Sequence, residues 1–125
     1  MQLKRVVVTG MGALTPIGNN LEAYWEGLRT GKSGSAPITY FDTEKFKTKF
    51  ACELKGYDPM DFFDRKEARK LDKFAQYALV SSDEAIADSG IDLDVVDKFR
   101  VGVVWGAGIG GLETFQNEVI GYAQG

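Results

Sequence analysis

Hydrophobic positions along the chain fall into short apolar runs that end in glycine and into longer segments with helical spacing. Two runs rich in β-branched residues, residues 4–9 and 101–105, each lead directly into a glycine-rich turn. Such runs are typical of strands that are buried on both faces, as in a parallel sheet. A helical pattern follows each turn, so the sequence predicts two strand–turn–helix units of an α/β protein.

Two helices are predicted from their start and stop signals. Asn19 and Glu22 form a capping box at the start of the first helix, and Gly31 stands at its end. The longest element is predicted to span residues 64–89, with Gly90 as its stop signal. Small residues recur along one stripe of this helix, which lets it approach a neighbouring element closely.

Alternation of apolar and polar side chains predicts an exposed antiparallel strand over residues 46–54, after a loop at residues 32–37. Cys52 falls on the apolar side of this strand, together with Phe50 and Leu54. A thiol in apolar surroundings is held neutral and inert, so we expect no catalytic role for Cys52.

Length and composition limit the classes of protein that the chain can represent. With 125 residues, of which 44% are hydrophobic, one domain or part of one is expected. A net charge of −3 excludes binding to nucleic acid by bulk electrostatics. One cysteine fits a reducing compartment, and the absence of histidine removes the commonest general base and metal ligand. No cluster has the spacing of zinc ligands, so no metal site is expected.

Near the start of the chain, Lys4 and Arg5 precede an uncharged run, residues 6–21, that superficially resembles a signal peptide. Glycine and proline interrupt this run, so no compact apolar helix can form there, and the run is too short to span a bilayer as a helix. We therefore expect a cytoplasmic protein that has no targeting segment and does not contact a membrane.

The glycine turn after the second apolar run leaves three interpretations open. Gly106, Gly108 and Gly111 match G-x-G-x-x-G, which favours dinucleotide binding when an acidic residue follows about 20 positions later. The sequence reaches only Gly125, so this test cannot be applied. A structural turn is the simplest interpretation, and the wall of an acyl pocket is the third.

Four cations lie at i, i+3, i+4 and i+7 near the start of the predicted long helix, namely Lys66, Arg69, Lys70 and Lys73. The amino end of a helix prefers acidic side chains, so cations gathered there cost stability unless an anionic partner offsets them. The alternative is a solvated face that Glu67 and Asp72 partly neutralise, and the residues alone favour this alternative.

Three ordered stretches together resemble the β-ketoacyl-acyl-carrier-protein synthases. Residues 6–18, VVVTGMGALTPIG, resemble the opening strand and turn of that family. Residues 65–78, RKEARKLDKFAQYA, resemble its long helix, and residues 101–112 resemble its second core strand and glycine turn. The resemblance extends over essentially the whole chain and is strongest to the synthase II branch, the elongating condensing enzymes of fatty acid synthesis.

This resemblance implies a thiolase-like layered α/β fold of two similar halves, with residues 1–125 as the first part of the amino-terminal half. It also implies a much longer, homodimeric enzyme without a cofactor. The nucleophilic cysteine, two histidines and a lysine of the family are then expected beyond residue 125. No catalytic residue falls within this chain, and Cys52 matches no catalytic position.

The implied activity is that of a 3-oxoacyl-[acyl-carrier-protein] synthase, a decarboxylative Claisen condensation in fatty acid elongation. A cysteine thiolate takes the acyl group from a carrier protein. Malonyl carrier protein then loses carbon dioxide, and the resulting enolate, stabilised by histidine hydrogen bonds, attacks the acyl thioester. Two alternatives remain open. One is a non-catalytic chain-length partner whose nucleophile is replaced, and the other is a nucleotide-dependent oxidoreductase that uses a glycine turn.

Two features of the chain receive roles through the resemblance. Ile109 stands where synthase II enzymes place an isoleucine at the wall of the acyl pocket, as a gate on chain entry, with ordinary core packing as the alternative. Lys66, Arg69 and Lys70 stand where the family docks the acidic acyl carrier protein, in its acyl- and malonyl-loaded forms. The resemblance therefore reverses the preference for a solvated face.

Overall fold

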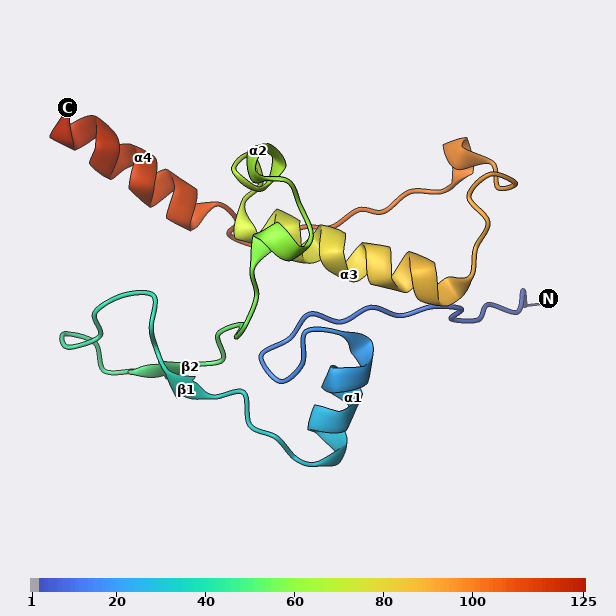
Figure 1. The fold of residues 1–125 in the computed structure, drawn as a ribbon, viewed down its shortest axis with the longest axis horizontal. Helices are drawn as coiled ribbons and strands as arrows, with labels where there is room; N and C mark the ends of the chain where they lie inside the picture. Colours follow the sequence, from blue (N-terminus) through green and yellow to red (C-terminus); the bar gives the residue numbers. More distant parts are fainter. Residues whose placement is uncertain (1–2) are drawn as a thin grey trace.

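Helix α3 (Lys73–Ser89) runs through the middle of the protein, and the other segments are arranged around it (Figure 1). The structure is a computed structural model that describes residues 3–125. Residues 3–9 and the last helix lie toward opposite ends of the long axis (Figure 1). The other elements, in chain order, are α1 (Leu21–Arg29), β1 (Ala36–Pro37), β2 (Phe50–Ala51), the 3-10 turn η1 (Pro59–Asp61), α2 (Arg65–Ala68), the 3-10 turn η2 (Lys98–Arg100) and α4 (Leu112–Gln124).

Helix α1 is capped one residue later than the sequence predicted. The side chain of Asn20 caps it by accepting a hydrogen bond of 2.8 Å from the backbone N–H of Ala23. The predicted cap, Asn19, instead donates its amide to the carbonyl oxygen of Lys55 at 2.8 Å. The predicted capping box is therefore wrong, because Glu22 stands one position too early to reach back to the true cap.

The single helix predicted for residues 64–89 is broken into α2 and α3. Asp64 caps α2 by accepting hydrogen bonds of 2.8 Å from two backbone N–H groups of its first turn. At Asp72 the backbone is extended, with φ −60° and ψ 153°, and this residue is the N-cap of α3. The prediction of one continuous helix is wrong because a second start signal interrupts it, whereas the predicted stop at Gly90 is confirmed.

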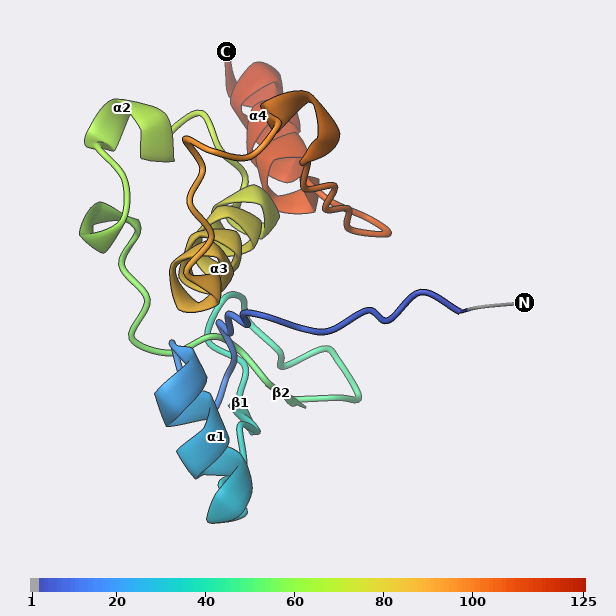
Figure 2. The same cartoon turned by 90° about the vertical axis from the view of Figure 1, so that its right-hand side faces the viewer.

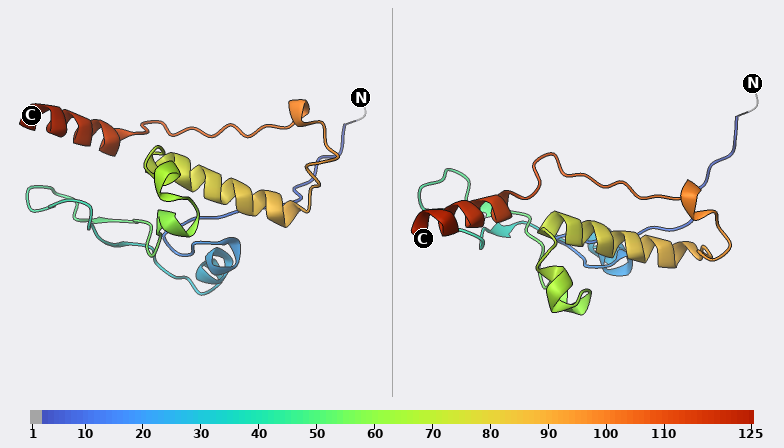
Figure 3. Two further views of the ribbon diagram at one scale, coloured as in Figure 1. Left: turned by 45° about the horizontal axis from the view of Figure 1, so that its top comes forward. Right: turned by 90° about the horizontal axis from the view of Figure 1, so that it is seen from above.

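The two predicted core strands are extended but carry no strand ladder within the described residues. Residues 4–9 and 101–105 run in the same direction, opposite to α3, which preserves a strand–helix–strand order (Figures 1 and 3). Val6 is 88% exposed and Val104 is 100% exposed, so apolar side chains that were predicted to be buried face solvent. Pairing fails within residues 3–125 because two strands alone cannot cover a parallel sheet that is apolar on both faces.

The sheet present among residues 3–125 is a short antiparallel pair of β1 and β2, in which Ala36 lies opposite Ala51. The strand predicted for residues 46–54 is thus reduced to β2, and the end of the predicted loop, residues 32–37, supplies its partner. Cys52 follows β2 and is exposed, so its predicted burial is wrong. Beyond Ala51 the chain is no longer paired as a strand, so alternate side chains no longer form one apolar face that could cover the thiol.

The turn after residues 4–9 lies directly against the backbone of α3. A Cβ atom at Gly12 would stand 2.0 Å from the carbonyl oxygen of Ser81, a separation that no side chain allows. Glycine is therefore required at position 12 for this approach. The small residues predicted along α3 serve the same purpose, since Ser81 belongs to that helix.

Two carboxylates of α3 hold the same turn through its backbone. Glu84 accepts hydrogen bonds from the N–H groups of Ala13 at 2.8 Å and Leu21 at 2.7 Å. Asp88, one helical turn later, accepts a hydrogen bond of 2.9 Å from the N–H of Met11. Because Leu21 is the first residue of α1, Glu84 fixes both the glycine turn and the start of that helix.

Few side chains are enclosed, and the buried ones lie on α3. They are Gln76, Ala78 and Val80, each at most 8% exposed. Figure 2 looks nearly along α3 and shows the other segments on different sides of it. A trough of about 600 Å³ remains between the first glycine turn, α3 and the segment that ends at Trp105. Polar contacts to the backbone therefore contribute much of what orders this part of the protein.

We expect Glu84→Gln to destabilise the protein by about 1–3 kcal/mol, because an amide donor would then face a backbone N–H that has lost its charged acceptor. Urea unfolding followed by circular dichroism measures this free energy. Asp83→Asn is the matched control, since Asp83 is an exposed neighbour on the same helix and should change the value by less than about 0.5 kcal/mol. Equal losses for both variants would contradict the assigned role of Glu84.

Candidate functional site

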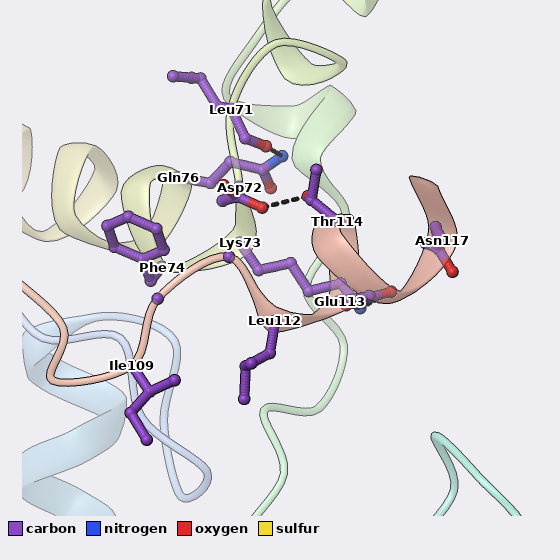
Figure 4. Close-up of a pocket in the computed structure, with 12 residues that line it drawn as sticks. Leu71, Asp72, Lys73, Phe74, Gln76, Ile109, Leu112, Glu113, Thr114 and Asn117 are labelled. Atoms are coloured by element: carbon purple, nitrogen blue, oxygen red, sulfur yellow. Dashed lines mark hydrogen bonds and ion pairs between the residues drawn. The ribbon is translucent and has the colours of Figure 1, made fainter. Parts of the chain in front are cut away.

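The glycine turn after residues 101–105 lies near the first turn of α3, and a pocket forms between them (Figure 4). The pocket has a volume of about 290 Å³, and Phe74, Ile109 and Leu112 are among its apolar lining residues. Ile109 is 76% exposed, so its side chain stands at the open mouth of the pocket rather than in packed surroundings. The structure thus places this predicted residue in the lining of a pocket, while its role as a gate stays a prediction.

Asp72 joins the glycine turn to α3. An aspartate at an N-cap usually accepts hydrogen bonds from the backbone N–H groups of its own helix. Asp72 makes no such bond and instead accepts a hydrogen bond from the hydroxyl of Thr114, in the first turn of α4 (Figure 4). Gly111 has a φ of 72°, and a Cβ there would lie 3.2 Å from the Asp72 carboxylate, so glycine is favoured at this position.

Lys73 makes a second link between α3 and the start of α4. Its ammonium lies 2.8 Å from the carboxylate of Glu113 and 4.5 Å from the ring centroid of Tyr40. The side chains of the ion pair are 45% and 62% exposed, so it contributes at most about 1 kcal/mol. Of the four cations noted in the sequence, Lys73 is therefore the one that has an acidic partner within residues 3–125.

Tyr77, near the start of α3, packs against Tyr57, with the two ring centroids 5.1 Å apart. Burial raises the pKa of Tyr77 to about 12, with an added contribution from Tyr40. Burial and the charge of Asp58 also raise the pKa of Tyr57, so both hydroxyls stay protonated at neutral pH and neither can serve as a general base. The Tyr57 hydroxyl donates a hydrogen bond of 3.0 Å to the side-chain oxygen of Gln76, which fixes the orientation of that amide.

The basic turn, defined by Lys66, Arg69 and Lys70, precedes the start of α3. All three side chains are exposed, and none forms an ion pair within the described part of the chain. Their predicted placement on one face of a single helix is wrong, because α2 ends at Ala68. Lys66 and Lys70 nevertheless line one hollow of about 400 Å³, which Asp64 and Glu67 line as well, so these cations remain close together beside two carboxylates.

The hollow at the basic turn and the pocket at the glycine turn are neighbours. Leu71 lines both of them, so the hollow beside the predicted docking cations borders the pocket that contains the predicted acyl gate. Sequence reasoning missed Asp72 and Gln76 as residues that shape this region. An aspartate before a new apolar run is a start signal even inside a helical pattern, and a glutamine beside an apolar stripe indicates a buried amide.

Residues 3–125 contain no cluster of histidine, cysteine, aspartate and glutamate side chains that could hold a metal ion. No helix in the same range has the length and apolar character needed to cross a membrane. The site as described is a pocket at the glycine turn that borders a hollow lined by residues of the basic turn.

Comparison with known protein families identifies the family of the chain. The model of the family described as "Beta-ketoacyl synthase, N-terminal domain" matches residues 3–123. The chain belongs to this β-ketoacyl synthase family. The predicted resemblance and the predicted fold class are confirmed by this match, and dinucleotide binding by an oxidoreductase is not favoured.

Similar curated proteins are named 3-oxoacyl-[acyl-carrier-protein] synthase 2. The one from Synechocystis is 43% identical over 118 residues, which cover 94% of this chain and 28% of that protein. The one from Staphylococcus aureus (strain COL) is 48% identical over 115 residues, which cover 92% of this chain and 28% of that protein. The ketoacyl synthase chain described here thus spans about 28% of the length of these curated relatives.

Solved structures of ketosynthases share the fold. The ishigamide ketosynthase/chain length factor matches with a TM-score of 0.64 and 38% identity, over 70% of this chain and 22% of that one. A type II polyketide synthase ketosynthase in complex with its acyl-carrier protein matches with a TM-score of 0.54 and 26% identity, over 73% of this chain and 23% of that one.

Proposed function

We propose that this sequence forms the amino-terminal part of a 3-oxoacyl-[acyl-carrier-protein] synthase of the type II branch. Such an enzyme condenses an acyl thioester with malonyl carrier protein during fatty acid elongation. The observation that carries the proposal is the identity of 43–48% to proteins of that name over more than nine-tenths of this chain. The proposed enzyme is a cytoplasmic homodimer that uses no cofactor.

The part of the enzyme described here supplies binding surfaces rather than reacting groups. The chain contains no histidine, and its one cysteine, Cys52, is exposed and matches no catalytic position of the family. The nucleophilic cysteine, the two histidines that stabilise the enolate and the lysine are expected beyond residue 125. The thiolate would accept the acyl group, and decarboxylation of the malonyl group would supply the carbanion that attacks it.

Ile109 is proposed as the gate of the acyl pocket. Its side chain is branched, exposed and located at the mouth of a pocket whose other apolar walls include Phe74 and Leu112. The glycine turn that carries Ile109 is tied to α3 by Asp72 and to no buried core. A side chain in this position can move to admit an acyl chain without disturbing packed neighbours.

The basic turn is proposed as the docking surface for the carrier protein. Its three cations are exposed and without acidic partners in the described residues, so their field extends into solvent and attracts an acidic surface. Docking there would bring the acyl chain toward the pocket that Ile109 lines, because Leu71 lines both the hollow and that pocket. The complex of a related ketosynthase with its acyl-carrier protein supports a partner of this kind.

A non-catalytic chain-length partner is the second candidate, since one similar structure is titled a ketosynthase/chain length factor. The two candidates differ at the nucleophile. Reading the sequence beyond residue 125 for the cysteine decides between them, and a replaced cysteine would favour the partner subunit.

We expect residues 1–125 alone to show no condensation of acyl and malonyl carrier protein, because they contain no histidine. The measurement is product formation by the isolated chain against a blank without protein. Turnover above that background would contradict the proposed division between binding and reacting residues.

In the complete synthase, Ile109→Phe should reduce kcat/KM for long acyl substrates by about tenfold or more and should leave short ones nearly unchanged, because a bulkier side chain closes the pocket mouth. Competition between acyl carrier proteins of different chain length measures this selectivity. Ile91→Phe is the matched control, since Ile91 is exposed and lies outside this pocket. If both chain lengths lose activity equally, Ile109 is a packing residue.

Charge reversal by Lys66→Glu and Arg69→Glu should raise the KM for carrier-linked substrate by about tenfold at low salt and leave kcat with a small thioester nearly unchanged. The effect should shrink as salt rises, because exposed charges are screened over about 10 Å at 0.1 M ionic strength. Lys47→Glu with Lys49→Glu, two exposed cations elsewhere, is the control and should have little effect. Equal losses with both substrates would indicate a structural role for the turn.

A further inference from the structure

Gln76 is the buried polar side chain of α3, and every hydrogen-bonding group of its amide has a protein partner. The residue is 6% exposed. Its side-chain nitrogen donates hydrogen bonds of 3.0 Å to the carbonyl oxygens of Ala68 and Leu71, and its oxygen accepts one of 3.0 Å from the Tyr57 hydroxyl. A buried amide with all its partners is costly to replace and fixes the groups that it contacts.

The two carbonyl groups bound by Gln76 stand on either side of Arg69 and Lys70. Ala68 is the last residue of α2, so its carbonyl is one that the helix leaves without a partner. The basic turn also has a single internal backbone bond, from the N–H of Lys70 to the carbonyl of Glu67 at 2.9 Å. Gln76 therefore fixes both ends of the turn from its buried side, while the cationic side chains extend into solvent.

We infer that Gln76 is a positioning residue for carrier-protein docking, which it serves by fixing the path of the basic turn between α2 and α3. The inference rests on the proposed function, because it assigns the docking geometry of that same surface. Electrostatic attraction alone needs only the charges, whereas productive docking needs them at fixed places. Gln76 supplies the fixed places, and it also lines the pocket at the glycine turn, so the test needs a measurement of docking that does not involve an acyl chain.

The test compares Gln76→Met with the parent in the complete synthase. Methionine has a similar volume but donates no hydrogen bond, so the turn loses both of its inner contacts. We expect the KM for acyl carrier protein substrates to rise about threefold to tenfold, and the Kd for carrier protein without an acyl chain, which does not enter the pocket, to rise by a similar factor. The KM should also respond less steeply to salt, because displaced cations no longer meet their acidic partners.

Two further measurements separate positioning from simple loss of stability. Tyr57→Phe removes the hydrogen bond to the Gln76 oxygen but keeps both donated bonds, so its KM should stay near that of the parent. In a background of Lys66→Glu and Arg69→Glu, Gln76→Met should cause no further rise in KM, because the positioned charges are already reversed. If Gln76→Met does not fold, Gln76→Asn, which is too short to reach both carbonyl groups, takes its place.

The outcomes distinguish this inference from the proposed function. If charge reversal raises KM but a folded Gln76 variant leaves it unchanged, the positioning role is wrong and docking at the basic turn stands. If Gln76→Met leaves the Kd for carrier protein without an acyl chain unchanged, or if Tyr57→Phe has the same effect as Gln76→Met, the positioning role is also wrong. If charge reversal itself has no effect on KM, the docking proposal is wrong, and the inference that rests on it is wrong as well.

Discussion

Hydrogen bonds between the carboxylates of α3 and the backbone of a distant turn are the interaction on which the arrangement of this chain depends. Glu84 and Asp88 accept hydrogen bonds from backbone N–H groups that have no backbone partner at the glycine turn. Such charge-assisted bonds are stronger than neutral ones, and they act where few apolar side chains are enclosed. Without them, residues 3–13 would have little to hold them against the helix apart from the close approaches at Gly10 and Gly12.

Polar side chains at the other end of α3 also hold neighbouring segments by hydrogen bonds. Asp72 and Gln76 direct their polar groups away from their own helix, toward Thr114 on one side and the end of α2 on the other. One helical turn thereby orders two loops, the glycine turn beside the pocket and the basic turn. The two proposed functions of the chain, docking and admission of an acyl group, thus both depend on side chains at the start of α3.

The sequence predicted what local signals decide. The stop at Gly90 and the exposure of Lys66, Arg69 and Lys70 follow from the chemistry of single residues and are seen in the structure. The break before α3 was not predictable from spacing, because residues 64–89 contain neither glycine nor proline and apolar residues keep their helical rhythm through the break. The break depends on whether Asp72 adopts the extended conformation of an N-cap or the helical one, and the structure has the extended conformation.

The strands and the thiol show a second kind of limit. Apolar runs such as residues 101–105 indicate that a segment prefers burial, but they do not say which segments supply the cover. Cys52 was placed by an alternation that holds only where strands pair, and pairing stops at Ala51. The position of Ile109 at a pocket mouth could be predicted only through the family resemblance, because the tie between Asp72 and Thr114 joins residues that are far apart in the sequence.

The bond between Ala13 and Glu84 also sets an order of events during synthesis of the chain. These residues are 71 positions apart, and ribosomes add about 5–20 residues per second, so roughly 4–14 s pass before the carboxylate can meet its N–H group. During that interval the valines of residues 6–8 do not yet have a complete α3 to lie against. Chaperones that bind short apolar segments would meet this stretch first, before the rest of the fold exists.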